Sequence, residues 1–106
     1  MRTMIKARFQ IGQIVRHKLF NYRGVIFDVD AIYSSTDEWY KKMAKSRPPK
    51  NAPWYQLLVN NETYITYVAQ QNLDIDLSDE PILHPMLDEI FDGIQNNLYV
   101  QRNYKN

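Results

Sequence analysis

The chain lacks cysteine, has only three glycines among 106 residues, and contains no long hydrophobic run. Without cysteine there are no disulfides and no thiolate metal sites, which favours a reducing compartment, and we expect a cytoplasmic protein. The glycines (Gly12, Gly24 and Gly93) lie far apart, so no glycine-rich phosphate loop is present. No apolar run approaches the roughly 20 residues that cross a bilayer, and the N-terminal residues lack the apolar core of a signal peptide.

The residues from Ile11 to Tyr33 predict two β-strands, Ile14–Lys18 and Tyr22–Tyr33, joined by a tight turn at Asn21. From Val25 onward apolar and polar residues alternate, which is typical of a half-buried strand. Gly24 inside this pattern predicts a bulge or a bend. A short strand, a basic turn and a long bent strand are typical of the start of a small SH3-like barrel.

The remainder of the chain predicts a helical insertion and further strands. Thr36, followed by two acidic residues, is expected to cap a short helix that the prolines near residue 50 end. The elements expected next are strands at Trp54–Asn60 and Thr63–Ala69, a 3₁₀ turn at Gln70–Leu73, a weak fifth strand near Asp74–Leu77, and an amphipathic helix from Met86 to about Asn97. We therefore predict one mainly β domain over residues 1–106: a small SH3-like barrel with a helical insertion between strands two and three, a C-terminal helix, and a flexible tail over residues 98–106.

Charge is uneven along the chain although the net charge is only +1. Residues 1–50 hold 11 Lys/Arg and 4 Asp/Glu, a balance of +7, whereas residues 51–106 hold 2 and 8, a balance of −6. This asymmetry indicates either a nucleic-acid-binding face or an acidic interaction segment. The alternative, which we favour, is that strands from both halves interleave in one domain, so that the charges largely neutralise one another.

No residue pattern points to catalysis. The two histidines, His17 and His84, lie in unrelated elements without a second ligand at metal spacing. Asp28 and Asp30 lie two residues apart on one strand, an arrangement that suits acid–base work or a cation, but equally a solvated face or salt bridges to neighbouring bases. We therefore predict no catalytic residues, no metal, no cofactor and no enzymatic activity.

The best candidate binding surface follows the first two strands and their turn. Basic and aromatic side chains alternate there, which suits phosphate contact combined with base stacking, or contact with an acidic protein partner. The candidate residues for a partner or DNA are Arg16, His17, Lys18, Tyr22 and Arg23. A second aromatic set, Trp39-Tyr40 and Trp54-Tyr55, is expected to contribute core residues at Trp54 and Tyr55, and a protein contact at Trp39 if that side chain is exposed.

Two blocks of residues carry a resemblance to a known family. The first runs from Phe9 to Leu19 and continues through Tyr22-Arg23-Gly24-Val25-Ile26-Phe27-Asp28-Val29-Asp30 to Tyr33, and the second is Ala52-Pro53-Trp54-Tyr55 with Leu58-Val59. In order and spacing these blocks resemble the YccV-like family of hemimethylated DNA-binding domain proteins, and the short chain resembles its single-domain heat-shock members. A Tudor- or KOW-like barrel is the alternative, but the Ala52–Tyr55 block speaks against it.

The resemblance implies an SH3-like barrel and two classes of function. One is binding of hemimethylated DNA at replication origins. The other is proteolysis, in which such proteins act as specificity factors for Lon protease and promote turnover of denatured proteins such as DnaA. We favour the proteolysis adaptor, because the chain lacks the strong positive charge expected of a DNA-binding domain. The polar tail after Leu98 is then a candidate contact for the protease, and the aromatic insertion is compatible with self-association.

Overall fold

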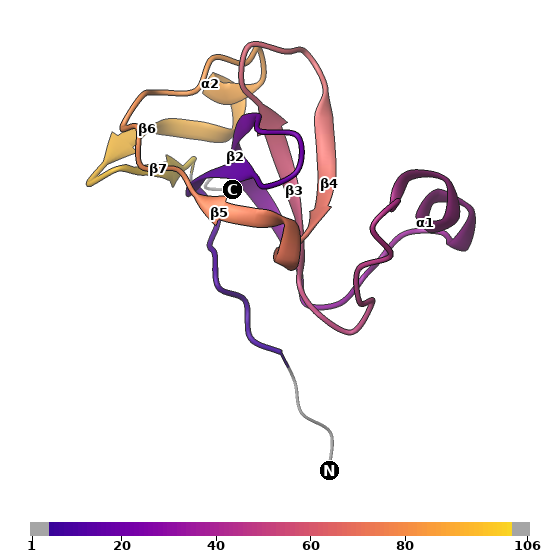
Figure 1. The fold of residues 1–106 in the computed structure, drawn as a ribbon. Helices are drawn as coiled ribbons and strands as arrows, with labels where there is room; N and C mark the ends of the chain where they lie inside the picture. The colour runs from indigo at the N-terminus through magenta and orange to yellow at the C-terminus, as the bar shows by residue number, and fades with distance from the viewer. Residues whose placement is uncertain (1–4, 103–106) are drawn as a thin grey trace, which may run out of the picture.

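The structure is a computed structural model that describes residues 5–102. It is mainly β, as expected, with one short helical insertion (Figure 1). The elements in chain order are β1 (Ile14–His17), β2 (Arg23–Asp30), α1 (Asp37–Met43), β3 (Trp54–Val59), β4 (Ile65–Ala69), the 3₁₀ turn η1 (Gln70–Asn72), β5 (Leu73–Ile75), α2 (Leu87–Ile90), β6 (Phe91–Gln95) and β7 (Leu98–Gln101). Within the described residues, no helix has the length and apolar character needed to cross a membrane.

Five strands form an antiparallel sheet in the order β4-β3-β2-β1-β5, and β6 and β7 form a separate hairpin. The expected barrel is not closed, because β4 and β5 are the two edges of this sheet and do not pair with one another in the described part of the chain. The pairing of β1 with β5 places Asp74 beside Arg16, so the acidic second half of the chain does interleave with the basic first half.

The insertion between β2 and β3 is confirmed. Thr36 caps α1, because its Oγ1 accepts a hydrogen bond from the backbone N–H of Trp39 at 3.0 Å. The acids of the first turn and the lysines of the last turn both suit the helix dipole. In Figure 1 the insertion extends away from the sheet on the side of β4.

The C-terminal helix predicted from Met86 to Asn97 is wrong. Only one helical turn, Leu87–Ile90, is present, and the chain then forms the β6–β7 hairpin. Asn96 and Asn97 turn the hairpin at φ values of 52° and 62°, which asparagine tolerates. Residues 98–101, which were expected to start a flexible tail, form β7, and Tyr99 is buried; the last four residues of that tail lie outside the described residues.

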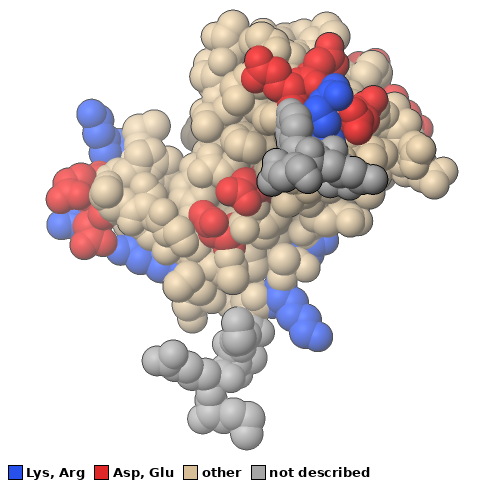
Figure 2. Space-filling view, turned by 180° about the vertical axis from the view of Figure 1, so that it is seen from behind, with Lys and Arg blue, Asp and Glu red and all other residues tan. Residues whose placement is uncertain are grey.

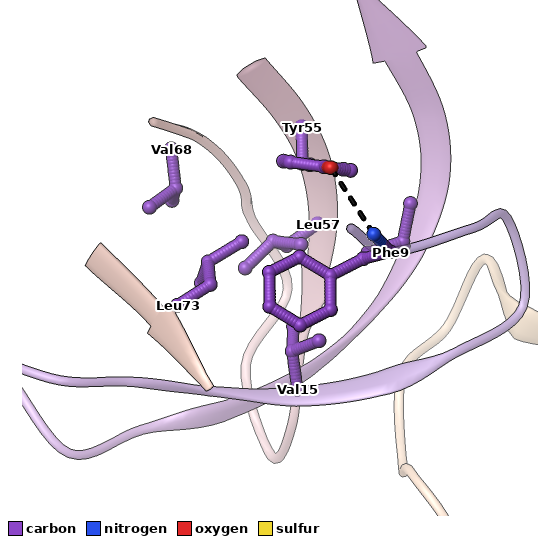
Figure 3. Close-up of a cluster of buried hydrophobic side chains, with 7 residues drawn as sticks. Phe9, Val15, Tyr55, Leu57, Val68 and Leu73 are labelled. Atoms are coloured by element: carbon purple, nitrogen blue, oxygen red, sulfur yellow. Dashed lines mark hydrogen bonds between the residues drawn. The ribbon is translucent and has the colours of Figure 1, made fainter. Parts of the chain in front are cut away.

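Two hydrophobic clusters occupy opposite faces of the five-stranded sheet, because successive residues of its strands point in opposite directions. Val25 belongs to one cluster and Ile26 to the other. Figure 3 shows the cluster to which Ile26 belongs, in which the hydroxyl of Tyr55, a residue of β3, accepts a hydrogen bond from the Phe9 N–H at 3.3 Å. Trp54 and Tyr55 are both buried, as the sequence predicted.

The glycine in β2 has a different role from the one predicted. The irregularity in the β2–β3 pairing lies between Ile26 and Asp28, not at Gly24. A Cβ atom on Gly24 would lie 2.8 Å from the carbonyl oxygen of Leu58, so glycine permits β2 and β3 to approach closely.

Candidate functional site

A groove of about 480 Å³ runs along the edge of the sheet. All five residues of β4, from Ile65 to Ala69, line it. Since neighbouring residues of a strand point to opposite faces, a groove that reaches all five must follow the strand's edge. We call this feature the β4 groove.

Two walls flank the β4 edge. One wall comes from α1, which contributes Trp39 and Met43, and the other comes from the β1–β2 turn, which contributes Leu19 and Phe20. Phe20 is 71% exposed, Leu19 60% and Met43 56%, so the walls present apolar surface to solvent. Exposed apolar side chains that gather around one concave surface are typical of a site that binds a partner or ligand.

An aromatic cluster fixes the α1 wall to the sheet. The ring of Trp39 lies 5.6 Å from that of Tyr67 on β4 and 6.0 Å from that of the buried Trp54 on β3. The loop after the helix is held as well, since Tyr40 donates its hydroxyl hydrogen to the Pro48 carbonyl at 2.6 Å and Trp54 donates its indole N–H to the Pro49 carbonyl at 3.2 Å. The wall is therefore formed before any partner binds.

The hydroxyl of Tyr67 anchors the start of the insertion. It donates to the Asp30 carboxylate at 2.6 Å and accepts from the Ser34 N–H at 3.0 Å. Burial, together with the hydrogen bond to Asp30, raises the pKa of Tyr67, so the phenol stays protonated at neutral pH. Asp28 accepts a hydrogen bond from the Val29 N–H, and neither carboxylate forms an ion pair with the bases of β1 or β2.

The opposite wall rests on His17, one of the residues predicted from the sequence to contact a partner. The side chain is buried, and its Nδ1 accepts hydrogen bonds from the backbone N–H groups of Leu19 at 3.1 Å and Phe20 at 3.2 Å. Its ring also lies against those of Phe20 and Tyr22, with centroids at 4.7 and 5.2 Å. Burial lowers the pKa of His17, so the ring is neutral at pH 7 and supports the turn.

The structure brings only part of the predicted basic set together. Tyr22 and His17 both line the β4 groove, and the Tyr22 hydroxyl shares a hydrogen bond with Thr66 at 2.8 Å. Arg23 instead points to the other edge of the sheet, where its Nε donates to Asp76 at 2.8 Å. Lys18 lies 3.8 Å from Asp74. Arg16 is exposed and forms no ion pair among residues 5–102.

Acidic residues from β5 and the loop after it therefore lie beside the bases of β1 and β2. Arg23 contacts both Asp76 and Glu80, and it is the most thoroughly paired base of the set. On the face of the molecule that Figure 2 shows, Lys and Arg side chains lie in separate places, several of them next to Asp and Glu, and no continuous basic area is visible. Of the bases in the first half of the chain, Lys18 and Arg23 are thus paired with acids of the second half.

Sequence reasoning missed the residues that shape the α1 wall and the edge strand. Met43 and Ile65 are apolar residues at ordinary core spacing, and nothing local marks them as 56% and 45% exposed. Trp39 was singled out as a protein contact only if exposed, and it is half-buried with one side on the groove. Among the described residues, no group of three or more His, Asp or Glu side chains is placed to hold a metal ion.

The sequence matches one known family over most of its length. The match is to the YccV-like family, described as "Hemimethylated DNA-binding protein YccV like", and it covers residues 7–98. The matched range includes both walls of the β4 groove, the edge strand between them, and the strands that carry Arg16 and Arg23.

Proposed function

The chain belongs to the YccV-like family, and from that membership we propose that it is a non-catalytic proteolysis factor of the HspQ heat-shock type. In this role it acts in the cytoplasm as a specificity factor for Lon protease. It binds denatured proteins, such as unfolded DnaA, and promotes their degradation.

The observation that carries this proposal is the apolar character of the β4 groove. Denatured proteins differ from folded ones mainly in the apolar side chains and backbone that they expose, and a preformed groove with exposed apolar walls suits both. Phe20 and Met43 supply the most accessible apolar surface on the two walls. The ion pairs that Lys18 and Arg23 form with acidic residues also fit protein partners better than a phosphate backbone.

The alternative is binding of hemimethylated DNA at replication origins. The family's own description favours it. The exposed Arg16 favours it as well. So do the bases in the second half of the insertion, Lys41, Lys42, Lys45, Arg47 and Lys50, of which Lys50 pairs with Asp37. DNA binding by these residues would weaken steeply with salt, because each phosphate contact releases counterions. Absence of binding at about 50 mM salt, where that electrostatic term is strong, would speak against this alternative.

The test is reconstituted degradation. Purified Lon and an unfolded substrate are incubated with and without the protein, and we expect faster substrate loss when it is present. The double variant Phe20→Ser with Met43→Ser should reduce the stimulation by about tenfold, since anchors of a binding site typically carry most of its energy.

A matched control removes equally exposed apolar surface elsewhere. Leu77 and Leu83 are 86% and 65% exposed and do not line the β4 groove. The double variant Leu77→Ser with Leu83→Ser should therefore stimulate Lon as the natural protein does. Equal loss in both double variants would argue that general surface hydrophobicity, not the groove, is what matters, and no stimulation by the natural protein would rule out the adaptor role.

A further inference from the structure

The free edge of β4 offers unpaired backbone groups inside the groove. The β3–β4 register pairs Trp54 with Ala69, and the Gln70 N–H donates to the Pro53 carbonyl. In an antiparallel pair, every second residue exchanges hydrogen bonds with the partner strand. The residues between them direct their own N–H and C=O away from that strand. The backbone groups of Ile65, Tyr67 and Ala69 therefore point out of the sheet. Within residues 5–102 those of Ile65 and Tyr67 have no backbone hydrogen-bond partner, whereas the carbonyl of Ala69 serves the first turn of η1 as its N-cap.

The two edges of the sheet differ in a way that singles out β4. The β5 edge has only three residues, and it is protected by charge, because it carries Asp74 and is followed by Asp76. Short, charged edge strands are how proteins prevent unwanted strand pairing. The β4 edge is longer and has neither a charge nor a proline, with the sequence Ile-Thr-Tyr-Val-Ala. It lacks the usual protection although it lies in an open groove.

We propose that the β4 groove binds an extended segment of an unfolded polypeptide as an added strand on β4. The inference rests on the proposed function, since the segment belongs to the denatured client. Strand addition supplies backbone hydrogen bonds that do not depend on sequence, which is what a factor with varied clients needs. The walls then select which side chains are accepted.

The geometry of the walls specifies the chemistry of the segment. Side chains of an added strand alternate between the two faces of the sheet. Those on one face meet Trp39 and Met43, and those on the other meet Phe20 and Tyr22. Both walls are apolar and aromatic, so the segment carries aliphatic or aromatic residues along its length.

Charge at the groove favours acidic flanks on that segment. Of the described residues that line the groove, only Lys45 carries a charge, because His17, the other basic residue there, is neutral. Lys41 and Lys42 lie just before Lys45, in the last turn of α1, whereas the acids of α1 lie in its first turn. An apolar segment with aspartate or glutamate at its ends therefore complements the groove better than one with basic ends.

The test uses a fluorescein-labelled peptide in which valine alternates with leucine between two pairs of aspartates. Fluorescence anisotropy measures its binding to the full-length protein. A second peptide carries N-methyl groups on consecutive backbone amides, which blocks both edges of the strand. A third carries them on every second amide, which leaves one edge intact. We expect the first and third peptides to bind with similar affinity and the second to lose binding.

A pair of variants tests the edge of β4 itself. Ile65→Pro removes the N–H of Ile65, which points outward and forms no hydrogen bond to β3. Proline is tolerated at such a position of an edge strand. Ile65→Ala removes the side chain but keeps the N–H. We expect Ile65→Pro to bind the first peptide about three- to tenfold more weakly than Ile65→Ala, the loss expected for one hydrogen bond. Should Ile65→Pro fail to fold, amide hydrogen exchange of the natural protein decides, and the peptide should slow exchange at Ile65 and Tyr67 but not at Thr66.

Four results separate this inference from the proposed function. Protease stimulation without peptide binding overturns the inference and leaves the adaptor role. Peptide binding of the expected pattern without protease stimulation supports the strand-addition site and overturns the adaptor role. Binding that is insensitive to N-methylation overturns strand addition. Slow exchange at Ile65 and Tyr67 before peptide is added, in a protein that sediments as an oligomer, assigns the edge to a second copy of the chain and also overturns the inference.

Discussion

Gly12 and Tyr99 meet backbone to backbone, so closely that a Cβ atom on Gly12 would lie 2.0 Å from the Tyr99 carbonyl oxygen. The Tyr99 N–H donates to the Gly12 carbonyl at 2.9 Å, and Gly12 has a φ of 93°. This contact fixes the C-terminal hairpin to the segment that leads into β1. The hydroxyl of Tyr99 then accepts a hydrogen bond from the Ile82 N–H at 2.9 Å, so one residue ties three distant segments together.

Substitution of Gly12 by alanine should be strongly destabilising. The new methyl group would collide with backbone, which cannot rotate away, and the positive φ adds backbone strain. We expect a loss of about 3 kcal/mol or more in the free energy of unfolding, measured by urea denaturation.

Two other glycines separate the steric collision from the backbone strain. Gly93 has a φ of 146° with open space around it, so Gly93→Ala reports strain alone; Gly24 has only a clash, 2.8 Å from the Leu58 carbonyl. Both should cost less than Gly12→Ala. A Gly12→Ala protein as stable as the natural one would show that the hairpin does not dock here.

Local chemistry explains why the insertion could be predicted and the C-terminal region could not. Thr36 caps α1 through a contact only three residues away, and such signals are readable in sequence. The apolar residues between Met86 and Ile94 fit helical spacing as well as they fit one turn followed by a strand. Burial of Phe91 and Tyr99 against the same cluster favours the hairpin, and that contact is tertiary.

The candidate site was predictable only in part for a similar reason. Arg23 and Asp76 are 53 residues apart, and only the pairing of β1 with β5 brings them together. His17 lies between two bases in sequence, which suggested a charged surface, but the turn folds its ring inward to accept two backbone N–H groups. Residue type could indicate a candidate region of the chain, whereas the direction of its side chains required the fold.

Breaking the pair between Arg23 and Asp76 should destabilise the protein. Their side chains are only 16% and 7% exposed, so Arg23→Gln leaves a largely buried carboxylate without its cation. We expect a loss of about 2 kcal/mol in thermal or urea unfolding, below the value for a fully buried pair. The control is Lys18→Gln, which breaks the exposed pair with Asp74 and should change stability by less than about 0.5 kcal/mol.

The ion pair between Arg23 and Asp76 should also make the stability of the protein depend on pH in the acid range. Burial alone would raise the pKa of Asp76, but hydrogen bonds from Ser78 and Arg23, with the charge of Arg23, hold it below its ordinary value of 3.8. The stabilisation is therefore present above pH 3.8 and is lost as the pH falls through the lower folded-state value. Arg23→Gln should flatten this part of the stability profile, and an unchanged acid limb would contradict the assignment.

His17 should make the β1–β2 turn sensitive to mild acid. Its pKa is below 6.5 in the folded protein because burial disfavours the charged ring, so the unfolded chain takes up the proton first. Stability is then complete above pH 6.5 and declines as the pH falls below it. Protonation of Nδ1 would also remove the acceptor for the Leu19 and Phe20 N–H groups.

His17→Asn is the matched control for this effect, because its side-chain oxygen can accept the same hydrogen bonds but does not titrate. The variant should lose some stacking energy at all pH values and lack the decline below pH 6.5. NMR titration of the natural protein gives the pKa of His17 directly. A value at or above 6.5, or an identical decline in the asparagine variant, would assign the effect to other groups.

Loss of the α1 cap should loosen one wall of the β4 groove without unfolding the sheet. In Thr36→Ala the Trp39 N–H loses its acceptor, which costs about 0.5–2 kcal/mol of helix stability. Since α1 has only seven residues, that loss is a large share of what holds it helical. Amide exchange should accelerate at Tyr40 and Ala44, whose N–H groups close the helix, and stay unchanged in β3. Ser35→Ala, one residue outside the cap, should leave both rates as they are. If α1 exchange were unaffected by Thr36→Ala, the packing of Trp39 against Tyr67 and Trp54, rather than the cap, would be what holds the wall in place.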